Sequence, residues 1–276
     1  MKMTVKGIFS KEKDLKMIWE IEKNRRKSYL VGTAHIFPYS FKKSLTRYIS
    51  NVNTVLLEGP LDESSMSTVV EQGSGGGENP SFYDALDVQT IIKINKELGY
   101  PFSGLSSFTS YMDIFKVGSG DLLYYQIRGQ RPWLAFFNIW FHYLKKRGWK
   151  YTMDVDAFNI AKQVGKDVYH LEKIEEQIEA LEGIPLERIV NFIKKIGQWS
   201  EYTYDYVKHY LRGDLEVLMS AAREFPTRCE SIIDRRDPIL YERMKAFLEK
   251  GNAIVFVGIT HIQGIKKMLL EDGYKV

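Results

Sequence analysis

The sequence predicts an α/β fold with a central mixed, largely parallel sheet, flanking helices and an inserted helical cap subdomain. Apolar runs of strand length alternate with segments of helical periodicity, which is typical of this class. Residues 81–148 show helical patterns and no strand signal, which indicates the cap. The 276 residues are 44% apolar, enough for one core without a disulfide or structural metal. We therefore expect a single domain over residues 1–276, with the cap at 81–148.

The first elements form a strand, helix and strand unit after an opening hairpin. Lys16 to Glu22 and Ser28 to Thr33 are strand-like runs separated by a short charged turn. A helical pattern follows Ser40, and the apolar run Thr54 to Leu57 predicts a buried strand. This order favours a parallel pair with a right-handed crossover.

A glycine-rich segment, residues 71–80, separates these elements from the cap. Its four glycines, serine and proline predict irregular structure, either a lid over a substrate or a surface linker. The apolar run Pro132 to Leu144 is too short to cross a bilayer, for which about 20 residues are needed. It predicts a buried helix or, because it is rich in aromatic residues, a helix that contacts a membrane surface or a partner.

The second half repeats the alternation of helices and strands. A helix after Asp154 leads to the strand Lys166 to Leu171, and further helices follow. The longest continuous strand signal is Gly251 to Gly258, and a last helix follows it.

Composition limits the partners and the cellular compartment that we expect for this protein. The 39 basic and 35 acidic residues leave a charge of +4 without a basic stripe, so nucleic acid is not an expected partner. The single cysteine, Cys229, excludes an intramolecular disulfide and fits a reducing compartment. The sequence shows no signal peptide and no transmembrane segment, so we expect a cytoplasmic protein. The oligomeric state is open.

Two short motifs share one form. Gly32 to His35 (GTAH) and Gly258 to His261 (GITH) each follow an apolar strand and have the spacing Gly-x-x-His. Ligands of open α/β sheets bind outside the carboxyl ends of the strands. If the two strands are neighbours, both histidines reach the same crevice.

Carboxylates follow two further strands. Glu58 comes directly after a buried run, where an unpaired charge would be costly, and Glu172 ends the strand near residue 171. Two imidazoles with one or two carboxylates form a plausible divalent metal site with room for a water. A metal-free alternative uses one histidine as general base and a carboxylate that orients it. The residues alone leave both alternatives open.

Asp154 and Arg235 are weaker candidates on the residues alone. Asp154 stands at a helix start, where an N-cap is the simpler interpretation. Arg235 lies among other charges, where a surface role is usual, although a cation there could stabilise an oxyanion. The other histidines have no matching partners and are interpreted as structural: His142, His170 and His209.

Five blocks of the chain resemble the TraB/PrgY family, which is related to the Tiki metalloproteases and more distantly to the erythromycin-esterase and ChaN-like proteins. The blocks, between residues 30 and 276, are LVGTAH, VLLEGP, TMDVDAFNIAKQVGKDVYHLEKIEEQIEAL, IIDRRDPILYERM and IVFVGITHIQG with LEDGYKV. The resemblance implies a divalent-cation-dependent hydrolase whose functional residues are His35, Glu58 and His261. It also implies roles for Asp154, Glu172 and Arg235. Where the family has Arg-Asn this chain has Arg235-Arg236, so which arginine enters the site is open.

We therefore expect a metal-dependent hydrolase, most plausibly a peptidase. His35, Glu58 and His261 would hold manganese, cobalt or zinc, with Glu172 or Asp154 as a further ligand or general base and Arg235 at the oxyanion. The partner would be a peptide or small-molecule substrate. One alternative is a PrgY-type regulator that binds a peptide or pheromone without cutting it. The other is a metal-free esterase with a histidine as general base.

Overall fold

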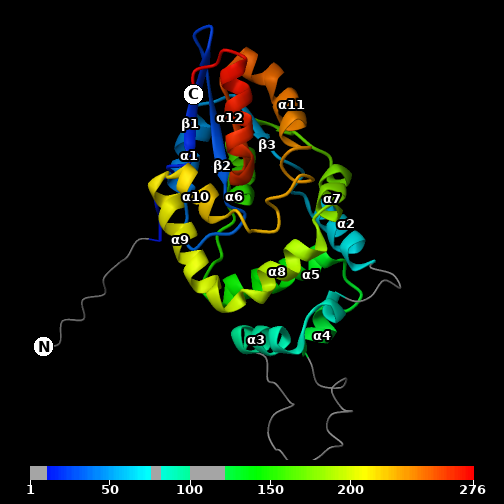
Figure 1. Ribbon diagram of the computed structural model, residues 1–276. Coiled ribbons are helices and arrows are strands. Elements are labelled where there is room, and N and C mark those ends of the chain that lie inside the picture. Colours follow the sequence, from blue (N-terminus) through cyan, green and yellow to red (C-terminus); the bar gives the residue numbers. More distant parts are fainter. Residues whose placement is uncertain (1–10, 76–81, 100–121) are drawn as a thin grey trace, which may run out of the picture.

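A computed structural model describes residues 11–75, 82–99 and 122–276. Its centre is a five-stranded sheet with the strand order β1-β2-β5-β3-β4 (Figure 1). The strands are β1 (Ile18–Lys23), β2 (Arg26–Thr33), β3 (Thr54–Leu57), β4 (Asp167–His170) and β5 (Ala253–Gly258). Only β1 runs antiparallel to its neighbour; the other four strands are parallel. The predicted mixed, largely parallel α/β sheet is confirmed.

The opening hairpin and the buried strands follow from their residues. Asn24 and Arg25 both have positive φ, 52° and 62°, which is the backbone of a two-residue turn that matches the strand twist. β5 is buried along its whole length and lies between β2 and β3, which explains its unbroken apolar run. β2 and β5 are neighbours, as a shared crevice for the two Gly-x-x-His motifs requires.

Helices cover both faces of the sheet. α1 (Lys42–Ser50) packs against α6 (Met153–Gln163), and α6 contacts β3 and β4. On the other face, α11 (Asp237–Lys250) contacts β2 and β5 and packs against α12 (Ile262–Glu271), which follows the short helix η4 (Ile259–His261) (Figure 1).

A layer of helices lies below the carboxyl ends of the parallel strands in the view of Figure 1. It includes α5 (Pro132–Lys146) and α8 (Leu186–Lys194), and α9 (Trp199–Arg212) rises from it to α10 (Leu215–Ala221) at the side of the sheet. Further elements are α2 (Glu63–Ser74), η1 (Phe82–Ala85), α3 (Val88–Leu98), α4 (Leu122–Ile127), α7 (Ile174–Glu182) and η3 (Ile196–Gln198). Residues 81 and 100–121 of the expected 81–148 cap lie outside the described residues, and the separate status of that cap remains a prediction.

α5 confirms the prediction of a buried helix at Pro132 to Leu144. Eight of its side chains, among them Trp133, Trp140 and Tyr143, are buried. No helix in the described ranges is both long enough and apolar enough to span a membrane.

The prediction of irregular structure over residues 71–80 is wrong for residues 71–74, which belong to α2. Gly73 is buried there, and a Cβ on it would lie 2.7 Å from Leu134 and 2.8 Å from Trp133. The glycine therefore lets α2 approach α5 closely and does not break the helix. Residues 76–80 lie outside the described residues, so the lid interpretation stays untested.

Candidate active site at the carboxyl edge of the sheet

Four candidate residues follow the four parallel strands at one edge of the sheet. His35 follows β2, His261 follows β5, Glu58 follows β3 and Glu172 follows β4. Because the strands are parallel and adjacent, their carboxyl ends meet at the same edge. Residues separated by most of the chain are thereby brought together.

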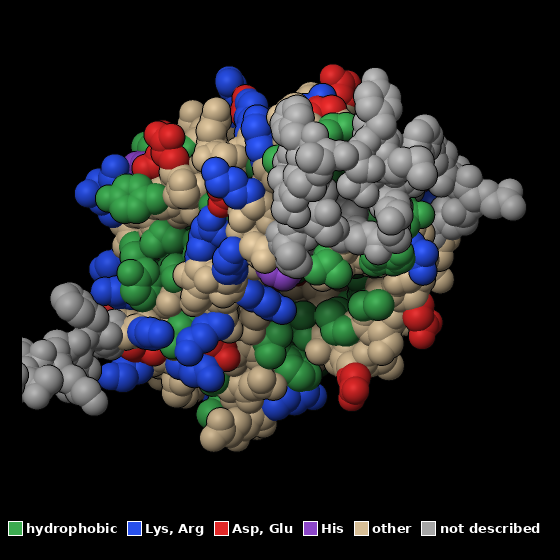
Figure 2. Space-filling view, turned by 90° about the horizontal axis from the view of Figure 1, so that it is seen from below, with side chains coloured by type: hydrophobic (Ala, Val, Ile, Leu, Met, Phe, Trp, Pro, Cys, Tyr) green, Lys and Arg blue, Asp and Glu red, His purple; other side chains and the backbone are tan. Residues whose placement is uncertain are grey.

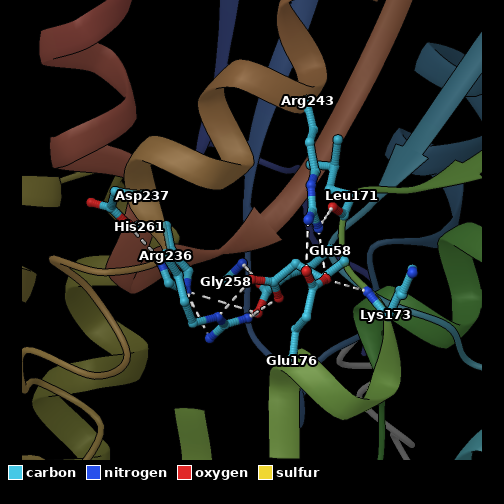
Figure 3. A network of polar contacts seen from close by, with 10 residues as sticks. Glu58, Leu171, Lys173, Glu176, Arg236, Asp237, Arg243, Gly258 and His261 are labelled. Carbon is cyan, nitrogen blue, oxygen red and sulfur yellow. Dashed lines mark hydrogen bonds and ion pairs between the residues drawn. The ribbon is translucent and has the colours of Figure 1, made fainter. Parts of the chain in front are cut away.

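Arg236 connects three of these residues (Figure 3). Its Nε donates to Glu172 Oε1 at 2.9 Å and its Nη2 to Glu172 Oε2 at 2.5 Å. The same Nη2 donates to Glu58 Oε1 at 2.6 Å, and Nη1 lies 3.4 Å from His261 Nε2. Both oxygens of Glu172 are thus used by one guanidinium, in the paired geometry that arginine forms with carboxylates. Glu172 is placed to hold Arg236.

The surroundings of Glu58 stabilise the ionised form of its carboxyl group. Burial alone would raise the pKa of its carboxyl, but the charges of Arg236, His261 and His35 and a backbone hydrogen bond together hold it well below its usual value. That hydrogen bond is donated by Gly258 N to Glu58 Oε2 at 2.6 Å. A Cβ on Gly258 would lie only 3.2 Å from Glu58 Oε2, so the glycine leaves room for this contact.

His261 is held by a carboxylate of its own. Its Nδ1 lies 2.6 Å from Asp237 Oδ1, and both side chains are buried. Burial raises the pKa of Asp237 more than the contact with His261 lowers it. Gly264 makes room for this pair, since a Cβ there would lie 1.9 Å from Asp237 Oδ2. With Asp237 as acceptor at Nδ1, the Nε2 of His261 faces the cluster, 3.8 Å from Glu58 Oε1.

His35 repeats this arrangement on the neighbouring strand. Its Nδ1 lies 2.9 Å from Asp154 Oδ2. Its Nε2 lies 3.7 Å from the position that a Cβ on Gly258 would take, beside Glu58 Oε2. Asp154 stands in the first turn of α6, whose N-cap is Thr152, so the N-cap interpretation of Asp154 is wrong. Its carboxylate reaches His35 instead.

Asp154 also changes the titration of His35. Desolvation lowers the pKa of the imidazole, but the charge of Asp154 and its hydrogen bond outweigh this effect and raise the pKa to about 9. His35 therefore carries a proton at neutral pH when nothing else occupies its Nε2.

This pair predicts a pH dependence of folding in the presence of a chelator. Folding favours the protonated form of His35, because the pKa of its imidazole is about 6.5 in the unfolded chain and about 9 in the folded chain. The stabilisation is complete below pH 6.5 and is lost as the pH rises through about 9. Urea unfolding between pH 6 and 10 should show this slope, and Asp154→Asn should remove it. Asp214→Asn, which alters the His209–Asp214 pair, is the control and should keep the slope; a slope that survives Asp154→Asn would contradict the assignment.

The structure resolves which arginine enters the cluster. Arg235 has an exposed side chain and pairs with Glu230 at 3.0 Å, whereas Arg236 is buried among Glu58, Glu172 and His261. Arg235 is thus the one candidate from the sequence that is not brought to this site. Asp237 was also missed, although an acidic residue before a proline at a helix start is a visible signal.

A second network fixes the turn that carries Glu172 (Figure 3). Arg243 of α11 contacts both carboxylate oxygens of Glu176 and donates to Leu171 O at 2.7 Å. Glu176 in turn accepts a hydrogen bond from Lys173 N. The N-terminus of α11 therefore supplies Arg236 and Asp237 to the cluster, and Arg243 further along the helix stabilises the loop after β4.

The cluster lines a pocket of about 570 Å³. Among its lining residues are His35, Glu58, Asp154, Arg236 and His261, and most of its remaining wall is apolar. Aromatic residues from several helices contribute to that wall: Trp133, Phe137, Trp140, Phe141, Trp149, Tyr202, Tyr206 and Phe225. Figure 2 shows hydrophobic side chains around a hollow on the face seen from below. The volume is in the range of small-ligand sites, where few polar groups orient a mostly apolar ligand.

The chemistry of these side chains suits a divalent cation in part. Two imidazoles with Nδ1 bound to carboxylates expose Nε2, which is the usual arrangement of metal-binding histidines. Four carboxylates outnumber the positive charges of Arg236 and protonated His35, so the cluster favours added positive charge. Within the part of the chain that the structure describes, however, no three His, Cys, Asp or Glu side chains are already grouped closely enough to hold an ion. Arg236 occupies Glu58 Oε1 in this arrangement.

The sequence profile of the TraB/PrgY/gumN family matches residues 17–276. No curated protein matches the chain, and no solved structure matches it.

Proposed function

This chain belongs to the TraB/PrgY/gumN family, and we propose from that premise and from the site geometry that it is a hydrolase that depends on a divalent cation. His35, Glu58 and His261 would hold the cation. A peptide is the substrate class we favour. A bound divalent cation supplies a water of lowered pKa and polarises a carbonyl group.

One observation carries this proposal: two histidines on neighbouring strands, each bound to a carboxylate at Nδ1, flank one ionised glutamate. Asp154 and Asp237 orient the two rings, and Gly258 N orients Glu58. Arg236 forms ion pairs with Glu58 and Glu172 and so stabilises their ionised forms. These contacts pre-organise the two imidazoles, because each ring is fixed through Nδ1 and leaves Nε2 for an ion. Both oxygens of Glu58 accept hydrogen bonds, so an ion would use a second lone pair of one oxygen or displace Arg236 from Oε1.

The test is metal binding and peptide hydrolysis by the purified protein. After dialysis against a chelator, wild-type protein should bind manganese, cobalt or zinc and hydrolyse members of a peptide library only with an ion restored. His35→Ala should lose both properties, because it removes one imidazole ligand. The matched control is His170→Ala at the exposed end of β4, which should keep both properties. Full hydrolysis by His35→Ala with metal bound would refute the assignment.

A metal-free hydrolase is favoured by the His35–Asp154 pair. An imidazole bound to a carboxylate and exposed to the pocket is the arrangement of a general base. With a pKa of about 9, His35 would act as a base mainly in alkaline solution. This alternative expects hydrolysis that survives chelation and rises with pH toward 9.

A binding protein without catalysis is favoured by Arg236. Its contact with Glu58 Oε1 occupies an oxygen that a cation would need, beneath a largely apolar pocket, as a binding site for an uncut peptide permits. This alternative expects every peptide of the library to stay intact with each of the three ions.

A further inference from the structure

The pocket wall contains a cation that no acidic side chain in the described ranges contacts directly. Arg228 lies between α10 and α11, and its Nη1 is 3.3 Å from Met219 Sδ and 3.4 Å from both Thr260 O and Thr260 Oγ1. Its Nε is buried and donates to no partner within hydrogen-bond reach among the described residues. Within those residues Arg228 also forms no ion pair with a carboxylate.

This situation distinguishes Arg228 from the other arginines near the site. Arg236 pairs with two glutamates and Arg243 pairs with Glu176. Burial lowers the pKa of Arg228 more than nearby charges raise it, yet a guanidinium stays protonated in proteins. Asp237 and Asp234 act on Arg228 without forming an ion pair with it, so an anion bound in the pocket would supply the direct partner that this half-buried charge lacks.

The position of Arg228 relates it to the active site. Thr260, which it contacts through two oxygens, directly precedes His261 in the second Gly-x-x-His motif. The remaining wall of the pocket is largely apolar and includes several aromatic side chains. In the described lining, Arg236 is the other guanidinium, and two glutamates already neutralise it. One unpaired positive charge matches a monoanion, such as a carboxylate, better than a phosphate dianion.

We propose that Arg228 binds the carboxylate of an amphipathic ligand whose apolar part lies among the aromatic side chains of the pocket. This deepens the proposed function and rests on it for the use of the same pocket, but binding requires neither metal nor hydrolysis. The carboxylate has two possible sources: the C-terminus of an apolar peptide or an aliphatic acid. In either case Arg228 selects free acids over their neutral amides.

The experiment compares acid and amide pairs in the presence of a chelator. The probes are N-acetyl-trileucine and its C-terminal amide, and decanoate and decanamide. Binding is followed by the fluorescence of the pocket tryptophans and by calorimetry. For wild-type protein we expect at least about tenfold tighter binding of the acid, which one charge-assisted pair can supply. Arg228→Gln should abolish the preference, Arg228→Lys should retain part of it, and Arg223→Gln, at a nearby exposed arginine, should leave it unchanged.

Each outcome decides the proposal. A preference in the peptide pair alone supports a peptide C-terminus, and a preference in the aliphatic pair alone supports an aliphatic acid. Equal binding of acid and amide by the wild-type protein would overturn the proposal, and so would the absence of binding. A preference that persists in folded Arg228→Gln would overturn it as well. The wild-type comparison needs no variant, so poor folding of Arg228→Gln leaves the test intact. Because a chelator is present, failure of the metal proposal does not affect this result.

Discussion

Replacing Arg236 with methionine should lower the free energy of unfolding by about 3–5 kcal/mol, as expected when one member of a buried ion pair is removed. The loss arises because Glu58 and Glu172 stay in the folded chain without the guanidinium that now contacts both. The side chain of Glu172 is only 1% exposed, so water cannot replace Arg236 there. The measurement is urea unfolding at pH 7 in the presence of a chelator.

The adjacent residue is a matched control for this experiment. Arg235 pairs with Glu230 on the surface, where both side chains are about 70% exposed (69% and 70%). Arg235→Met should therefore change the stability by only about 0–1 kcal/mol. Equal effects of the two substitutions would show that Arg236 is not the organising cation of the cluster. A pKa of Glu58 that stays low in Arg236→Met would contradict the charge assignment in the same way, since Arg236 is the strongest of the charges that lower it.

Much of the fold could be predicted because strands with an unbroken apolar run must be buried. β3 has the bounds expected from the sequence, and the other strands differ by one to a few residues. The parallel arrangement then brought His35, Glu58 and His261 to one edge, since each lies shortly after the end of a strand. Here local pattern and overall topology agree.

The choice between Arg235 and Arg236 could not be predicted because neighbouring residues differ only in the direction of their side chains. That direction is set by the turn before α11, where the contacts with Glu58 and Glu172 are formed by residues far apart in the sequence. A crevice at the strand ends was predicted, but its apolar wall could not be predicted, for the same reason. Its walls come from packing between helices such as α5 and α9, which no local pattern encodes. At Gly73 the local pattern was misleading. Glycine is typical of loops, but tertiary packing places this glycine inside a helix.

Glu58→Gln should have the largest effect on function with a modest effect on folding. Glu58 accepts one hydrogen bond at each oxygen, from Arg236 Nη2 and from Gly258 N. An amide has one acceptor oxygen, so one of these donors loses its partner, at a cost of about 1–3 kcal/mol. The negative charge between the two histidines is also lost. Under the proposed function Glu58 holds the cation, so we expect weaker metal binding and a drop in hydrolysis of at least about 10–100-fold, the loss that follows removal even of a residue that only orients a metal ligand.

The functional and structural consequences of this substitution are separated by comparison with Glu172→Gln. Both oxygens of Glu172 are occupied by Arg236, so this change should lower stability while metal binding is largely kept. Glu230→Gln, at the exposed partner of Arg235, should change neither. Activity and metal affinity are measured at a temperature where all three variants are folded, as checked by circular dichroism. If Glu58→Gln kept wild-type metal affinity and hydrolysis while Glu172→Gln lost them, the ligand would be Glu172, and Glu58 would be the residue that holds Arg236.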